Sequence, residues 1–185
     1  MMAHIDRRPG IRPRPSVGRR LDIAARASFP ACITILLMLL TQAPVGLPEQ
    51  AASLPAVALG CVWFWSLVRP AALPPPIVFL MGLLLDLLGY LPLGVGAFTL
   101  LAVHGVALAM RRSLAQRGSA WIWIVFAAVA AAASLVIWLM VMLLTFRLLS
   151  PYPAIFIAVL AVAIFPLLAV PFASAHRSIA NPERA

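Results

Sequence analysis

The sequence has very little charge, and acidic residues are especially rare in it. Only 10% of its 185 residues are charged, five of them are acidic, and all 14 basic residues are arginine. A typical soluble domain carries about 25% charged residues, so this composition excludes a chain that is solvated over most of its surface. The formal net charge of +9 would suggest nucleic acid as the partner of a soluble domain. Here the basic flanks of membrane-spanning segments explain it, so no nucleic-acid partner is expected.

Cysteine is scarce too, and the common catalytic motifs are missing. Cys32 and Cys61 both lie in apolar runs, which argues against a disulfide framework or a metal site. The sequence contains no HExxH, CxxC, GxSxG or Walker-type motif and no paired carboxylates. We therefore expect a protein without enzymatic activity, cofactor or metal. Among the few polar residues inside the apolar runs are Thr34, Asp86, Thr99, His104, Ser134, Thr145 and Arg147.

Hydrophobic length is what the sequence has in abundance, since 64% of its residues are apolar. A helix needs about 20 apolar residues to cross a membrane. Six runs are of roughly this length, at residues 29–47, 51–68, 73–90, 93–110, 120–148 and 154–173. This pattern predicts an all-α polytopic membrane protein with about six transmembrane helices, in which residues 27–176 form a single transmembrane domain. The fifth run is long enough that it must tilt or protrude.

The distribution of arginine predicts how the chain is oriented. If the N-terminus and six spans start from the cytoplasm, thirteen of the fourteen arginines lie on the cytoplasmic side and only Arg147 lies outside. The positive-inside rule therefore favours an N-in, C-in topology. Residues 1–26 hold seven of these arginines and show no apolar period up to Ser16. We expect them to form a disordered cytoplasmic tail attracted to anionic lipid, and residues 177–185 to form a second short tail.

Aromatic residues fall near the expected ends of several runs. On the six-span topology, Tyr90 and Tyr152 lie at the outer boundary of the membrane. Tryptophan and tyrosine are enriched at both membrane interfaces, so we interpret all of these residues as anchors of an aromatic belt. The tryptophans at the cytoplasmic boundary are Trp63, Trp65, Trp121 and Trp123.

The third run contains Asp86, the only acidic residue inside a strongly apolar segment. A carboxylate in hydrocarbon costs a few kcal/mol, so its presence needs a physical reason. At 100° per residue, Gly82 and Gly89 lie on the same stripe of a helix as Asp86, and Phe79 adjoins them. Small residues around a polar group allow another backbone to approach closely. The stripe therefore predicts a packing or partner-binding face.

Arg147 is the candidate counter-ion for Asp86, because both lie near the outer ends of their helices. This predicts an intramembrane ion pair between them. The alternative is that Asp86 caps the turn that follows its helix, at residues 89–92, while Arg147 extends to lipid phosphate. His104 lies much deeper than Asp86, so we expect it to form a hydrogen bond between helices rather than a dyad with the carboxylate.

The third run and the turn after it read Phe79-x-x-Gly82-Leu83-x-x-Asp86-Leu87-Leu88-x-x-x-Pro92-Leu93-Gly94. This pattern resembles the signature of the rod shape-determining protein MreD family, which consists of small bacterial inner-membrane proteins. The motif covers roughly a tenth of the chain, and the remainder is similar in architecture alone. The resemblance adds Pro92 and Gly94 to the candidate site residues Gly82, Asp86 and Gly89.

Membership of this family would imply a non-enzymatic scaffold of the bacterial cell-wall elongation machinery. The implied partners are an MreC-like single-span membrane protein, the actin-like MreB and the peptidoglycan polymerase complex. The family's fold is similar to that of the substrate-binding S-components of energy-coupling-factor transporters. A subunit that transports a small molecule or lipid precursor is therefore the alternative function.

Overall fold

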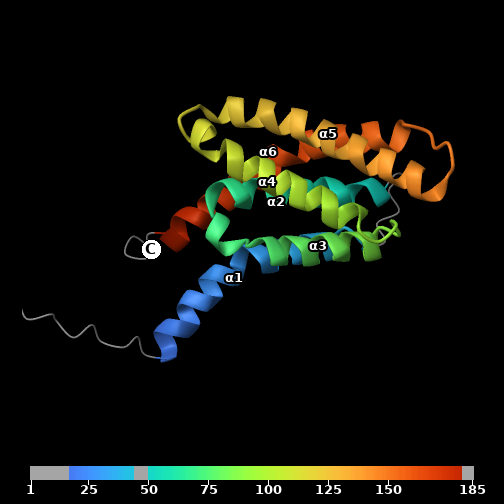
Figure 1. Ribbon diagram of the computed structural model, residues 1–185. Coiled ribbons are helices and arrows are strands. Elements are labelled where there is room, and N and C mark those ends of the chain that lie inside the picture. The colour runs from blue at the N-terminus through green and yellow to red at the C-terminus, as the bar shows by residue number, and fades with distance from the viewer. Residues whose placement is uncertain (1–16, 44–49, 181–185) are drawn as a thin grey trace, which may run out of the picture.

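The computed structural model describes residues 17–43 and 50–180, and the side chains of residues 28–43 and 50–174. In this part of the chain all regular structure is helical (Figure 1). Two short 3₁₀ turns, η1 (Gln50–Ala52) and η2 (Pro70–Ala72), precede α2 and α3. The six α-helices are α1 (Val17–Leu40), α2 (Ser53–Val68), α3 (Pro75–Leu88), α4 (Val95–Ala115), α5 (Ser119–Thr145) and α6 (Tyr152–Ala180).

Four of the helical segments are long and apolar enough to cross a membrane. They cover residues 50–68, 95–115, 119–145 and 152–174. α3 and the apolar part of α1 are shorter. The predicted fold class, an all-α polytopic membrane protein, is confirmed.

Helix α2 is the centre of the bundle. Nearly every side chain from Leu54 to Ser66 is buried, and α2 lies against α1, α4 and α6. A helix that is apolar all round its circumference is stable in such a position, because protein surrounds it on every side. α5 and α6 pack against each other on one side of α2, while α3 and α4 form a second hairpin (Figure 1).

The expected interfacial role of Trp63 and Trp65 is wrong. Both indole rings are fully buried, Trp63 against Phe126 and Trp65 against Phe29 and Phe172. Neither indole N–H has an acceptor among the described residues, so the area of the rings, rather than hydrogen bonding, places them. The other aromatic residues of the predicted belt, Trp121, Trp123, Tyr90 and Tyr152, are exposed.

Helices extend into both predicted tails where the structure describes them. α1 begins at Val17 and continues through Pro30, so residues 17–26 are helical and do not belong to a disordered tail. α6 continues to Ala180 through Pro166 and Pro171, so it includes the start of the predicted second tail. Residues 1–16, which carry the predicted lipid-binding arginines Arg7, Arg8, Arg12 and Arg14, lie outside the described part.

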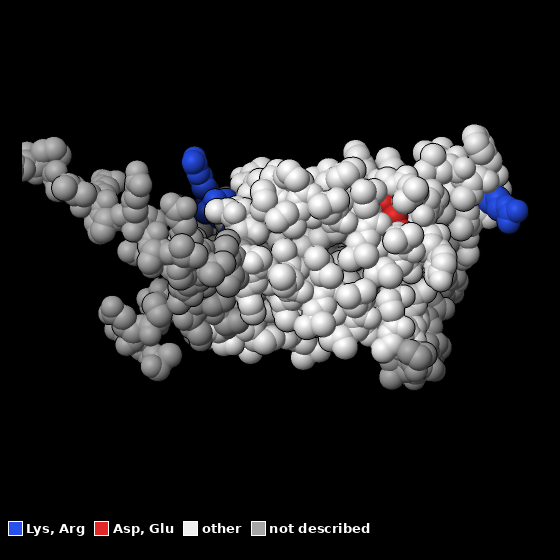
Figure 2. All heavy atoms as spheres, turned by 90° about the horizontal axis from the view of Figure 1, so that it is seen from below, with Lys and Arg blue, Asp and Glu red and all other residues white. Residues whose placement is uncertain are grey.

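Charged side chains are segregated along the molecule. The basic side chains visible in Figure 2 lie at the two ends of the described part, and on this face the surface between them is uncharged apart from a small acidic spot. This separation matches a membrane protein whose apolar midsection lies in hydrocarbon. Which end faces the cytoplasm stays a prediction.

The hairpin of α3 and α4 depends on a very close approach of its two backbones. A Cβ atom built at Gly82 in α3 would lie 2.2 Å from Cα of Ala97 and 2.6 Å from its backbone nitrogen. Only glycine fits there unless the helices separate, because the atoms that a Cβ would meet belong to the backbone of α4. This is the close packing through small residues that membrane helices use in place of a hydrophobic driving force.

Replacing Gly82 with alanine should therefore lower the free energy of unfolding by about 1–3 kcal/mol, the usual cost of overpacking a well-packed interface. Gly105→Ala in α4 is the matched control, because nothing lies within 4 Å of the equivalent atom there. That control should leave stability unchanged or raise it by up to about 1 kcal/mol through helix propensity. Denaturation in detergent micelles measures both changes. Equal midpoints for the two variants would refute the close approach.

Candidate functional site

Asp86 lies in the last turn of α3 and is only 1% exposed. Three prolines start this helix, with Pro74 in extended conformation before the first turn. Proline suits this position because its missing N–H would have no partner in a first helical turn. The helix then turns one face towards protein, made of Val78, Met81, Gly82, Leu85 and Asp86.

The carboxylate of Asp86 binds the N-terminus of the next helix. Its Oδ2 accepts a hydrogen bond from the Gly94 N–H at 2.8 Å, and its Oδ1 accepts one from the Gly96 N–H at 2.5 Å. The first amides of an α-helix have no partner within the helix, and its N-terminus carries a partial positive charge. Asp86 therefore supplies to α4 what an N-cap side chain supplies locally, but from a different helix. We call this arrangement the Asp86 cap: Asp86 with the amides of Gly94 and Gly96.

The backbone of α4 is shaped to accept this carboxylate. Gly94 precedes the first helical residue and has a φ of +101°, a left-handed conformation that residues with a Cβ rarely adopt. Its conformation brings two amides of the same short segment towards one carboxylate. A Cβ at Gly96 would lie 2.6 Å from Oδ1 of Asp86, so the carboxylate occupies the space of a side chain.

The main chain of Asp86 closes its own helix as well. Its carbonyl oxygen accepts a hydrogen bond from the Leu91 N–H at 3.0 Å. Gly89 ends α3, and Tyr90 follows in a left-handed conformation with a φ of +53°. This is the geometry of a Schellman motif, which uses one of the last unsatisfied carbonyls of a helix. One residue thus completes the C-terminus of α3 and the N-terminus of α4.

The predicted ion pair between Asp86 and Arg147 is wrong. Both oxygens of the carboxylate bind backbone amides, whereas Arg147 is exposed in the connection after α5. No salt bridge joins these two residues, which both lie in the described part. The alternative interpretation is correct in that the Asp86 side chain caps backbone groups that follow its helix. The capped group is the start of α4 rather than residues 89–92.

Other predicted site residues take different places around the Asp86 cap. Gly82 and Gly94 contact the start of α4 as described, while Gly89 and Pro92 belong to the turn, where the Pro92 carbonyl accepts a bond from Val95. Phe79 is 44% exposed and does not belong to the buried face of α3. Sequence reasoning missed Gly96, although the pair of glycines at 94 and 96, at the start of a helix, indicated a close backbone approach.

His104 forms the second buried polar contact between helices. Its Nδ1 lies 2.7 Å from the hydroxyl of Ser66 on α2. That hydroxyl donates to the Val62 carbonyl, so it accepts from the imidazole, and Nδ1 carries the proton. The expectation that His104 forms a hydrogen bond between helices is confirmed.

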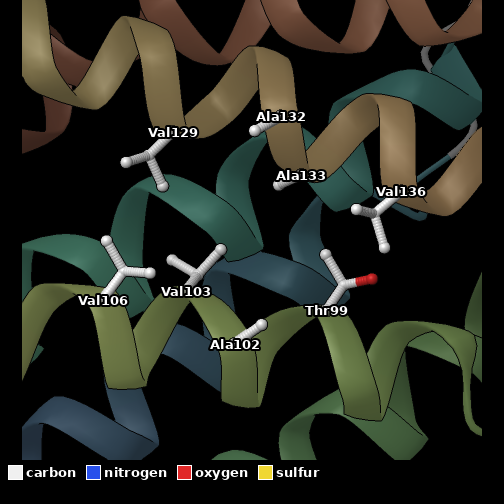
Figure 3. A pocket seen from close by; sticks show the side chains of 8 residues that line it. All are labelled: Thr99, Ala102, Val103, Val106, Val129, Ala132, Ala133 and Val136. Atoms are coloured by element: carbon white, nitrogen blue, oxygen red, sulfur yellow. The ribbon is translucent and has the colours of Figure 1, made fainter.

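A hollow of about 110 Å³ opens between α4 and α5 (Figure 3). Thr99 is its one polar lining residue, and the Thr99 hydroxyl donates to the Val95 carbonyl of its own helix. Neither Asp86 nor His104 lines it. Its other lining residues are Ala102, Val103, Val106, Val129, Ala132, Ala133 and Val136.

Comparison with known proteins adds no relative: no family model, no curated protein and no solved structure matches the chain.

The Asp86 cap makes a specific prediction for the two residues of the rejected ion pair. Asp86→Asn keeps the size of the side chain but retains one acceptor oxygen, so at least one amide at the start of α4 loses its partner. A buried hydrogen bond to a charged group contributes about 1.5–3 kcal/mol, and the variant should be destabilised by that amount. Arg147→Gln should change stability by less than about 0.5 kcal/mol. Denaturation curves of both variants in the same detergent measure these changes in stability. An equal loss of stability in both variants would support the ion pair instead.

Proposed function

We propose that this protein is a non-enzymatic membrane scaffold of the bacterial cell-wall elongation machinery, in the manner of the MreD family. It lies in the inner membrane with both termini in the cytoplasm and helps to maintain rod shape. Its partners are an MreC-like single-span membrane protein, MreB and the peptidoglycan polymerase complex. The arginine-rich N-terminal segment adds contact with anionic lipid.

The observation that carries this proposal is that both carboxylate oxygens of Asp86 already accept hydrogen bonds within the protein. An intramembrane carboxylate is by default a candidate for substrate binding or proton transfer. Here both of its oxygens bind the backbone of α4, which leaves the residue a role in holding a helical hairpin together. His104 and Thr99 are likewise engaged with other groups of the protein. The engagement of Asp86, Thr99 and His104 thus supports a packing function.

The outer faces of the helices supply surface for partner helices. On α3, Leu80 and Leu87 point away from the protein core and are exposed. On α4, Ala102 and Gly105 are exposed on a helix that already tolerates close backbone approach. Small and leucine-rich faces are those on which membrane helices associate through close packing.

A transporter subunit is the competing function, and the hollow between α4 and α5 is the feature that would serve it. Ligand pockets generally enclose about 300–1,000 Å³ and combine apolar walls with several convergent polar groups. The hollow measures about 110 Å³ and has one polar lining residue. The scaffold is therefore the better supported of the two.

Site-specific photo-crosslinking in cells tests the proposal. Crosslinking residues placed at Leu80 and Leu87 on α3 should capture a single-span membrane protein. Leu167 and Val170 on α6, which are similarly exposed, are the matched controls for random collision in the membrane. Depletion of the protein should turn rod-shaped cells round. Retained rod shape, together with submicromolar binding of a vitamin by the purified protein, would favour the transporter subunit instead.

A further inference from the structure

The lengths of α3 and α5 differ too much for both to span the same membrane in the same way. α5 has 27 residues and lies between Arg117 and Arg147, so it is about 40 Å long, close to the distance of about 40–45 Å from headgroup to headgroup. α3 has 14 residues and is about 21 Å long, while the hydrocarbon alone is about 30 Å thick. If both helices start near the same membrane surface, α3 ends before it reaches the other surface.

The arrangement of the helices agrees with these lengths. The connections after α2 and α4 lie at one end of the molecule, so α3 and α5 start at the same end (Figure 1). At the opposite end, the connection between α5 and α6 extends further along the long axis than the turn between α3 and α4. Arg147 belongs to the more distant of these two connections.

The turn between α3 and α4 has the composition of a lipid-facing segment. Residues 87–110 contain no charged side chain. Within the turn, Tyr90 is 95% exposed and Leu93 is 76% exposed. A water-facing turn usually carries polar or charged residues, and a large apolar side chain gains free energy only when it leaves water.

The main chain of this turn finds several of its hydrogen bonds within the protein. Backbone that lies in hydrocarbon must find its hydrogen bonds within the protein. The Asp86 cap and the Schellman bond satisfy the amides of Gly94, Gly96 and Leu91, and the Pro92 carbonyl binds the amide of Val95. Between residues 89 and 96, the amides of Gly89, Leu91, Gly94, Val95 and Gly96 have a partner, whereas those of Tyr90 and Leu93 have none among the described residues.

We propose that the turn of residues 89–94 ends inside the lipid of the leaflet on the Arg147 side and does not emerge into water. Leu93 contacts acyl chains, and the hydroxyl of Tyr90 points to the glycerol region above it. The partner of this surface is lipid, and the Asp86 cap satisfies two of the amides that an embedded turn must satisfy within the protein. This inference depends on the membrane fold alone and is independent of the proposed scaffold function.

Spin-label accessibility in nanodiscs of phosphatidylcholine and phosphatidylglycerol tests this placement. Single nitroxide labels are attached to Leu93→Cys, Leu148→Cys and Leu80→Cys in the full chain after Cys32→Ala. Cys61 is fully buried and is left in place; the unsubstituted background measures any label that it takes up. Leu148 is 96% exposed beside Arg147 and Leu80 is exposed on α3, so they report the headgroup level and the hydrocarbon.

The label at position 93 should collide with dissolved oxygen about as readily as the label at position 80. Its collisions with a water-soluble nickel chelate should be several-fold fewer than those of the label at position 148. Equal nickel accessibility at positions 93 and 148, whether both are high or both are low, would overturn the proposal. A thermal midpoint equal to that of the unlabelled chain shows that each labelled protein is folded.

Discussion

The hydrogen bonds between the Asp86 carboxylate and the amides of Gly94 and Gly96 are the interaction on which the α3–α4 hairpin depends. The free N–H and C=O groups of a helix end inside a membrane must form hydrogen bonds within the protein, because hydrocarbon offers them no partner. Asp86 meets this requirement for two helix ends at once, through its carboxylate and its carbonyl. The close approach at Gly82 follows from the same geometry, since α4 must start next to α3 for the carboxylate to reach it. The cost of burying a charge is thereby offset by charge-assisted hydrogen bonds and by the dipole of α4.

The number and class of the helices could be predicted because apolar length is a direct consequence of membrane thickness. Which face of a helix meets protein and which meets lipid could not be predicted in the same way. Both surroundings are apolar, so a leucine on α2 and a leucine on α5 look alike in sequence. For this reason Trp63 and Trp65 were expected at the membrane interface, although they lie in the core. The helical start at Val17 was missed because the arginines there hide the weak apolar period.

The candidate site was only partly predictable for a related reason. Asp86 stood out because a carboxylate in an apolar run is costly, and its neighbour Gly82 followed from helical periodicity. Arg147 was the wrong partner because opposite charge and similar depth in the membrane do not by themselves bring two side chains into contact. The actual partners are main-chain amides eight and ten residues further along, which no side-chain pattern reports. Two glycines at 94 and 96 were the available signal, because amides can approach a carboxylate most closely where no Cβ intervenes.

The Asp86 cap holds the start of α4 against the end of α3, and the proposed scaffold function depends on this hairpin being stable. The most direct test is NMR of the protein with ¹⁵N-labelled glycine and ¹³Cγ-labelled aspartate in nanodiscs. Scalar coupling across the hydrogen bonds should connect the Asp86 carboxyl carbon to the amide nitrogens of Gly94 and Gly96, and both amides should resist exchange with water. Rapid exchange of these two amides, with no coupling to Asp86, would contradict the account.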